Sequence, residues 1–354
     1  MSAPHIDRDY LAAILGRMLQ IHSPTGMTDD IVALVCNELK NFGVTFDLTR
    51  RGAIVAELPG KRQVPDRAVA VHVDTLGAMV REIKDNGRLA VVAVGHWSSR
   101  FAEGARVTVH GDAGKSWRGT ILPKKASGHT YNAEVDSQPV DWAQLEVRLD
   151  ARVANKADVV AAGVNIGDLI AVDTNAEFTD SGFVVSRHLD DKAGVASVLA
   201  MMKAVMENRL ELPVNCHVIF TIAEEVGLGG AHVLDQDVGE LVAVDNGTFA
   251  PGQNTSEYGV TIAMMDMSGP FDRRLNHHLM DLCRANDIDH SRDVFKFYRS
   301  DVASALEAGY DTRASLICFG LDASHGHERA HMDSFVAVAR LLLAYVQSPP
   351  VVSG

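Results

Sequence analysis

The amino-acid sequence predicts an α/β fold, in which an α/β/α sandwich is interrupted by a small inserted β-barrel. Helical and strand-like segments alternate at both ends of the chain, a pattern typical of α/β domains. In the middle, short β-like runs alternate with Gly, Asp and Asn turns, which is typical of a small all-β unit. A chain of 354 residues also favours about two domains. We therefore expect residues 1–76 and 181–354 to form one discontinuous domain, with residues 77–180 inserted as the barrel.

The N-terminal part predicts two helices followed by three strands. Apolar residues recur at helical spacing between residues 9 and 42, and the sequence SPTG at 23–26 breaks the pattern with a turn. Thr28 is a candidate cap for the second helix. Strand-like runs follow at residues 44–48, 53–58 and 68–73.

The remaining elements follow from the same patterns. In the middle of the chain, β-like runs occur at 79–83, 89–94, 106–110, 145–149 and 169–172, with one helix at 154–162. Towards the C-terminus, helices are predicted at 191–207, 270–286 and 334–345, and strands at 214–223, 241–245 and 314–319.

Composition restricts the class of protein. Apolar residues make up 47% of the chain and charged residues 22%, which is ordinary for a soluble globular protein. The net charge of −13 argues against nucleic-acid and anionic-membrane partners, because both select for Lys and Arg. We see no signal-peptide pattern and no apolar stretch of transmembrane length. The four scattered cysteines form no CxxC pair, so we expect reduced core residues of a cytoplasmic protein.

Two adjacent acids, Glu224 and Glu225, end the apolar strand predicted at 214–223. An unpaired carboxylate is costly to desolvate, so each needs a cation, a proton or water. Neighbouring side chains on a strand point in opposite directions, so one acid could bind a metal while the other acts as a general base. The alternative is a solvated junction between strand and loop.

Three further apolar strands are followed by His or acidic residues. His72 is followed by Asp74, a spacing that suits a metal ligand oriented by a carboxylate. Asp190 and Asp245 also follow strands, although Asp191 could be a simple helix cap and Asp-Asn-Gly is a common turn. Ligands gather outside the carboxyl ends of strands in open α/β sheets, so the recurrence indicates one shared site.

A histidine-rich segment at 322–331 supplies a further candidate ligand. Residues 327–331 (HERAH) match the helical zinc-protease motif H-E-x-x-H, which would make Glu328 a rival base. The context opposes this interpretation, because the helical pattern begins only at Ser334 and no acid follows Asp333. Two histidines and three carboxylates instead suit two divalent ions about 3.5–4 Å apart. Nitrogen and oxygen ligands fit zinc, cobalt or manganese.

The chain resembles the M42 metallo-aminopeptidases. Residues 71–77 (VHVDTLG), 189–194 (LDDKAG) and 223–231 (AEEVGLGGA) are similar to the three signature segments of that family. Residues 161–168 (AAGVNIGD) resemble its β-domain, and residues 320–321 resemble the segment before its final His ligand. The resemblance extends over nearly the whole chain and implies the α/β/α metallopeptidase fold.

The resemblance also implies roles for seven residues. His72 and Asp245 would each bind one ion, with Asp190 as a bridge between the two ions. Glu225 and His327 would complete the two metal sites. Glu224 would be the general base, and Asp74 would orient His72. A non-proline cis peptide between Asp190 and Asp191 is implied as well. The implied activity is hydrolysis of the N-terminal peptide bond of short peptides by a water activated between two metal ions. Self-association, often into a hollow tetrahedral dodecamer, is implied too.

Three positions depart from the pattern of the family. Thr75 stands where an acid is usual, Lys192 where Arg is usual, and Glu328 where a small residue is common. They point to a divergent subgroup, and one such subgroup accompanies bacterial synthesis of a dipeptide osmoprotectant. The same fold and metals would also serve a deacylase or a carboxypeptidase-type hydrolase. A catalytically inactive peptide-binding protein is a further alternative, but binding alone needs no base such as Glu224.

Overall fold

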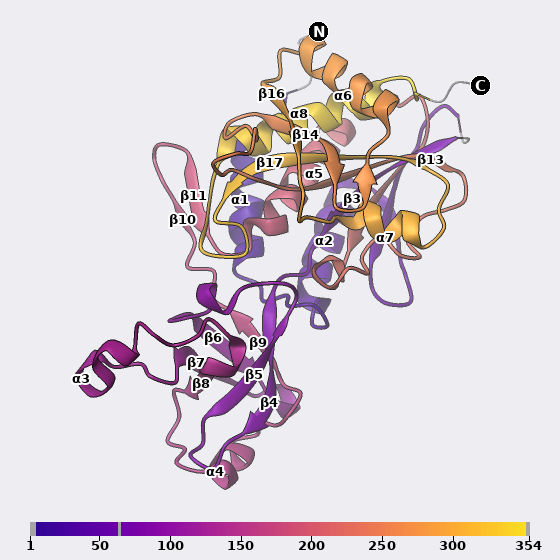
Figure 1. Cartoon of the computed structure of the whole chain (residues 1–354). Helices are drawn as coiled ribbons and strands as arrows, with labels where there is room; N and C mark the ends of the chain where they lie inside the picture. Colours follow the sequence, from indigo (N-terminus) through magenta and orange to yellow (C-terminus); the bar gives the residue numbers. More distant parts are fainter. Residues whose placement is uncertain (1–4, 63–64, 352–354) are drawn as a thin grey trace.

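The computed structural model describes residues 5–62 and 65–351 and shows two bodies joined at one junction (Figure 1). The larger body contains a 12-stranded sheet with helices packed on its faces. The smaller body is a closed β-barrel. This arrangement confirms the predicted α/β fold with an inserted barrel.

Four parallel strands form the centre of the large sheet, in the order β12, β3, β13 and β17. The strands of this sheet are β1 (Thr45–Leu48), β2 (Ile54–Leu58), β3 (Asp66–His72), β10 (Glu177–Phe178), β11 (Phe183–Ser186), β12 (Cys216–Thr221), β13 (Val238–Thr248), β14 (Val260–Asp266), β15 (Gly269–Pro270), β16 (His290–Val294), β17 (Arg313–Asp322) and β18 (Glu328–His331). Because the central strands are parallel, their carboxyl ends meet at one edge of the sheet.

Helices cover both faces of this sheet. They are α1 (Arg8–Leu19), α2 (Asp29–Phe42), α5 (Leu189–Glu207), α6 (Arg273–Ala285), α7 (Asp301–Glu307) and α8 (Met332–Gln347). In β3, Val69 and Val71 belong to the core shared with α1, α2, α5, α6 and α8, whereas Ala68 and Ala70 belong to the core shared with α7. Alternate side chains of a strand face opposite sides of a sheet, so β3 is buried on both faces.

The barrel is formed by six antiparallel strands in the order β4-β5-β8-β7-β6-β9. They are β4 (Gly77–Ile83), β5 (Leu89–Val94), β6 (Arg106–His110), β7 (Ser116–Pro123), β8 (Leu145–Leu149) and β9 (Leu169–Val172), with the short helices α3 (Gly128–Tyr131) and α4 (Lys156–Ala161) in its loops. Val107, Val109, Ile121, Val147 and Ile170 fill its interior.

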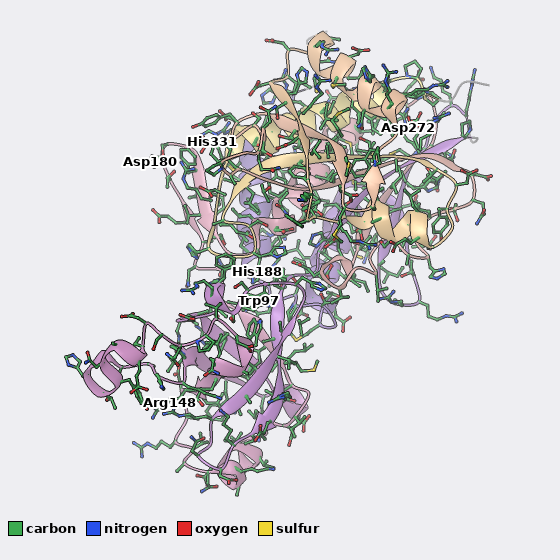
Figure 2. The ribbon with its side chains drawn as sticks, viewed as in Figure 1. Trp97, Arg148, Asp180, His188, Asp272 and His331 are labelled. Atoms are coloured by element: carbon green, nitrogen blue, oxygen red, sulfur yellow. The ribbon has the colours of Figure 1, made fainter. Side chains whose placement is uncertain are left out.

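The pairing of strands places the end of the barrel earlier than residue 180. Val172 is the last residue of β9, whereas β10, at 177–178, pairs with β11 in the large sheet. At this junction the Nε2 atom of His188 lies 3.2 Å from the carbonyl oxygen of Val172. Figure 2 shows His188 and Trp97 close together where the two bodies meet.

The predicted helices and the strands with long apolar runs are present, with ends shifted by a few residues. Thr28 precedes α2 as predicted, but its side chain makes no capping hydrogen bond. Seven strands and two α-helices of the structure were not predicted: β7, β10, β11, β14, β15, β16, β18, α3 and α7. The four cysteines are buried and unpaired: Cys36, Cys216, Cys283 and Cys318. Among the described residues, each helix is too short or too polar to cross a membrane.

Candidate metal centre

The carboxyl edge of the central strands gathers the predicted polar residues. His72 ends β3, and Glu224 and Glu225 follow β12 in a single 3₁₀ turn. Asp245 lies within β13, where the backbone is held by parallel pairing to β17. Asp190 precedes the regular part of α5, and its peptide bond to Asp191 is cis, as the resemblance implied.

Two groups of side chains in this cluster could each hold a metal ion. One group is His72, Asp190 and Asp245, and the other is Asp190, Glu225 and His325. Asp190 belongs to both groups. Its Oδ1 atom lies 3.2 Å from Nε2 of His72, and its Oδ2 atom lies 3.3 Å from Nε2 of His325. Each oxygen of this carboxylate therefore faces a different group, which is the geometry of a bridging ligand.

The histidine of the second group is His325, whereas the sequence predicted His327 as the ligand. His325 has a left-handed backbone (φ 65°) that turns its imidazole towards Asp190 and Glu225. His327 lies outside both groups and is exposed. The distance along the chain from Gly320 could not show which of these histidines faces the cluster, because that depends on the turn between β17 and β18.

The H-E-x-x-H motif is not on a helix. Residues 328–331 form strand β18, which pairs with β11 and β17. Nδ1 of His331 accepts a hydrogen bond from the backbone N–H of Asp333 at the start of α8. The structure therefore supports the prediction that this segment is no helical zinc-protease motif.

Both histidines of the two groups are oriented by a backbone carbonyl. Nδ1 of His72 lies 3.0 Å from the carbonyl oxygen of Asp74, and Nδ1 of His325 lies 2.7 Å from that of His96. A carbonyl accepts but cannot donate, so Nδ1 carries the proton in each ring. Nε2 of each ring faces Asp190 and, once deprotonated, is the atom that would bind a metal, the usual arrangement for a ligand histidine.

Glu224 and Glu225 have different surroundings. Glu225 belongs to the second group, and its buried Oε1 has no hydrogen-bond partner among the described residues. Glu224 lies outside both groups, although its Oε2 atom is only 3.8 Å from Nε2 of His72. The backbone N–H of Glu224 donates to Oδ1 of Asp74 (3.1 Å), whose Oδ2 accepts from the hydroxyl of Thr25 (2.6 Å).

The cluster concentrates negative charge in a buried place. Burial raises the pKa of Glu224 and Glu225, and it raises that of Asp245 to about 7. Burial also opposes ionisation of Asp190, but hydrogen bonds from His325 and His72 hold the pKa of Asp190 below its ordinary value. Buried carboxylates in such numbers need compensating cations. The set of two imidazoles and three carboxylates, with the unpartnered Oε1 of Glu225, fits two divalent ions.

Two residues in or beside this cluster make contacts that were not predicted from the sequence. The side-chain amide of Asn246 donates to Oδ2 of Asp190 (2.8 Å) and to Oδ1 of Asp245 (3.1 Å). Lys192, which is buried, donates to the carbonyl oxygens of Met18 and Ile21, and burial lowers its pKa to about 7. Most of these contacts join segments far apart in the chain, so local sequence patterns do not predict them. The sequence indicated Asn246 only through the Asp-Asn-Gly turn pattern.

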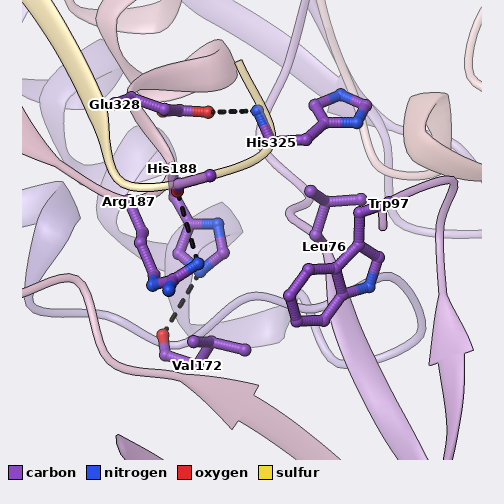
Figure 3. A pocket seen from close by; sticks show the side chains of 8 residues that line it. Leu76, Trp97, Val172, Arg187, His188, His325 and Glu328 are labelled. Carbon is purple, nitrogen blue, oxygen red and sulfur yellow. Dashed lines mark hydrogen bonds between the residues drawn. The ribbon is translucent and has the colours of Figure 1, made fainter. Parts of the chain in front are cut away.

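A small cavity lies beside the second group. It is lined by Leu76, Trp97, Val172, Arg187, His188, His325, Gly326 and Glu328. Figure 3 shows Leu76, Trp97 and His325 on one side and Arg187 and Glu328 on the other. Since Trp97 and Val172 come from the barrel segment, both bodies contribute to the surroundings of the candidate metal centre.

Comparisons with known proteins show what this chain is similar to. The family model described as M42 glutamyl aminopeptidase matches residues 52–341. A putative aminopeptidase of Bacillus subtilis (strain 168), YhfE, is 37% identical over 338 residues, which cover 96% of this chain and 97% of that protein. The glutamyl aminopeptidase of Lactococcus lactis subsp. cremoris is 28% identical over 186 residues, covering 51% of this chain and 50% of that protein.

Solved structures share the fold. The TET aminopeptidase from the marine sediment archaeon Thaumarchaeota archaeon SCGC AB-539-E09 superposes with a TM-score of 0.87 at 18% identity, covering 96% of each chain. The TET1 peptidase of Pyrococcus horikoshii, described as able to assemble into a tetrahedron or a large octahedral shell, gives a TM-score of 0.84 at 21% identity, covering 95% of this chain and 99% of that one.

Proposed function

Because this chain belongs to the M42 glutamyl aminopeptidase family and is an aminopeptidase, we propose that it hydrolyses the N-terminal peptide bond of short peptides with two divalent metal ions. His72, Asp190 and Asp245 would hold one ion, and Asp190, Glu225 and His325 the other. Nitrogen and oxygen ligands without thiolate favour zinc or cobalt, with manganese as a further candidate.

The chemistry divides between the ions and Glu224. Two bound ions would lower the pKa of a water molecule and polarise the scissile carbonyl. Glu224 would accept a proton from that water while the water oxygen bonds to the carbonyl carbon. It would then donate the proton to the leaving nitrogen as the C–N bond breaks. Asp74 would position this base through the backbone N–H of Glu224, as well as orienting His72.

One observation carries the proposal. Glu224 is a largely buried carboxylate beside the candidate metal ligands, yet it belongs to neither ligand group. An acid that is close to the ions but not needed to bind them is available to move protons.

A substrate panel tests the proposed reaction. Aminoacyl chromophores with a free α-amine, their N-acetylated counterparts and peptides read from the C-terminus would be offered to metal-loaded protein. We expect hydrolysis of the free-amine substrates alone. Cleavage of the acetylated compounds would indicate a deacylase, release of C-terminal residues would indicate a carboxypeptidase, and no hydrolysis in the presence of bound metal would indicate a peptide-binding protein.

We also propose that the chain forms a homo-oligomer, with a dodecamer as the expected form. Support comes from the similarity to the TET1 peptidase of Pyrococcus horikoshii, whose assemblies are a tetrahedron or an octahedral shell. Light scattering should give a mass several times that of the 38.2 kDa chain. A monomer across a wide range of concentrations would contradict this proposal.

A further inference from the structure

Glu328 connects the two segments that carry ligands of the second metal group. It is the first residue of β18, only 1% exposed, and belongs to neither ligand group. Its Oε2 atom accepts hydrogen bonds from the backbone N–H groups of Leu189 (2.7 Å) and Asp190 (3.3 Å). Its Oε1 atom accepts from the backbone N–H of His325 (3.0 Å), the bond drawn in Figure 3.

These backbones need an external acceptor. His188 and His325 both have left-handed conformations, and Asp190 and Asp191 have non-helical backbone angles, so neither segment continues a regular ladder of hydrogen bonds. A buried N–H without a partner is costly. The carboxylate of Glu328 supplies the acceptor for three such groups and fixes the backbone of Asp190 relative to that of His325.

We propose that Glu328 is a positioning residue that sets the geometry of the Asp190–Glu225–His325 metal site. The inference rests on the proposed two-metal function and adds to it a residue that contacts no ion. Glu328 is not a base, because both of its oxygens are occupied by backbone donors. The same contacts explain why an acid stands at this position: a carboxylate can accept on both oxygens, which no small residue can do.

The first metal group depends less on Glu328. Its residues His72 and Asp245 lie in β3 and β13, where pairing within the sheet fixes the backbone. Asp190, which both groups share, is also held through its side chain by the amide of Asn246. In the second group, two of the three residues, Asp190 and His325, take their backbone positions from Glu328. Loss of this carboxylate should therefore weaken the second site selectively.

Glu328→Gln tests this selectivity. Glutamine keeps the size of the side chain but turns one oxygen into an NH₂ donor, which would face a backbone N–H of one of the two segments. Metal-free protein would be titrated with Zn²⁺ by calorimetry at mildly alkaline pH. The wild type should bind two ions per chain. The variant should bind one ion normally and the other about 10–100-fold more weakly, the usual cost of losing a group that orients a ligand.

Asp322→Asn, at the exposed last residue of β17, is the matched control and should leave both affinities unchanged. Two ions bound with wild-type affinity by Glu328→Gln would overturn this inference and leave the proposed function standing. A wild type that binds no pair of ions would overturn both the inference and the proposed function.

Hydrogen exchange of the metal-free wild type gives a check that needs no variant. The amides of Leu189, Asp190 and His325 should be protected, and rapid exchange of all three would refute the role of Glu328.

Discussion

Glu224 and Glu225 are neighbours in the chain that have separate surroundings. The 3₁₀ turn after β12 points Glu225 towards His325, while Glu224 stays within 3.8 Å of His72. Gly227, with a left-handed backbone (φ 75°), ends this turn and leads the chain away from the cluster. One short turn thus separates the candidate ligand from the candidate base.

Replacing Glu224 by Gln should separate catalysis from metal binding. The variant keeps all five candidate ligands, so we expect two ions per chain and an unchanged fold. Because the amide cannot accept the proton of water, kcat should fall by about 10²–10⁴-fold. Glu103→Gln, at an exposed position on the barrel, is the control and should retain full activity. Near-normal turnover by Glu224→Gln would show that another group is the base.

The two histidines at 325 and 327 offer a direct comparison of neighbouring positions. His325→Ala should lose one ion. Its loss of metal affinity should be larger than the roughly 10–100-fold loss caused by removing a residue that only orients a ligand. His327→Ala should keep both ions and its activity, because this side chain is exposed and outside both groups. Metal analysis after dialysis would distinguish the two variants. Loss of metal from His327→Ala, with none from His325→Ala, would restore the prediction made from the sequence.

At the scale of elements, the sequence predicted those parts of the fold that have a strong local pattern. The apolar runs of β3, β12, β13 and β17 indicated buried strands, and their polar ends indicated where a site would form. Strands β16 (HSRDV) and β18 (ERAH) have no apolar run and exist because neighbouring strands pair with them. The position of His325 depends on such a pairing, which is why the sequence identified His72 and Asp190 but not His325.

The start of α5 beside the cluster depends on close approach of the chain. A Cβ atom on Gly194 would lie 2.1 Å from Oδ1 of Asp191, whose Oδ2 accepts the backbone N–H of His72. Gly194→Ala should therefore lower the free energy of unfolding, although Ala favours a helix by about 1 kcal/mol over Gly. Gly16→Ala in α1 is the matched control, since its nearest side-chain contact would be 3.9 Å. Chemical denaturation should show that Gly16→Ala is more stable than the wild type and that Gly194→Ala is not. Stabilisation by both substitutions would contradict the close approach of Gly194 and Asp191.

At the scale of the whole molecule, the junction between the two bodies contains a pair of histidines. Nδ1 of His22, after α1, lies 3.1 Å from Nε2 of His110, at the end of β6. Burial lowers the pKa of both residues, and the neighbouring His110 lowers the pKa of His22 further. The charged groups that act on the pair are Asp173, Lys192 and Arg118 around His22, and Asp30 around His110.

This pair should make the junction sensitive to acid. Because both pKa values are lower in the folded protein than the ordinary value of about 6.5, the unfolded chain binds more protons below that pH. The stability contributed by the neutral pair is therefore present above about pH 6.5 and is lost as the pH falls. Thermal unfolding should show that the wild type loses more stability between neutral and mildly acidic pH than the His22→Gln variant does. Equal losses in the two proteins would show that the pair does not contribute.

The central claim is that two ions held at the carboxyl edge of the sheet make this chain an active aminopeptidase. The most direct measurement is a titration of metal-free protein with Zn²⁺ or Co²⁺, in which bound metal and hydrolysis of an aminoacyl chromophore are followed together. We expect no hydrolysis without metal and full activity only when both sites are filled. Full activity in the metal-free protein, or activity that saturates at a single bound ion, would contradict it.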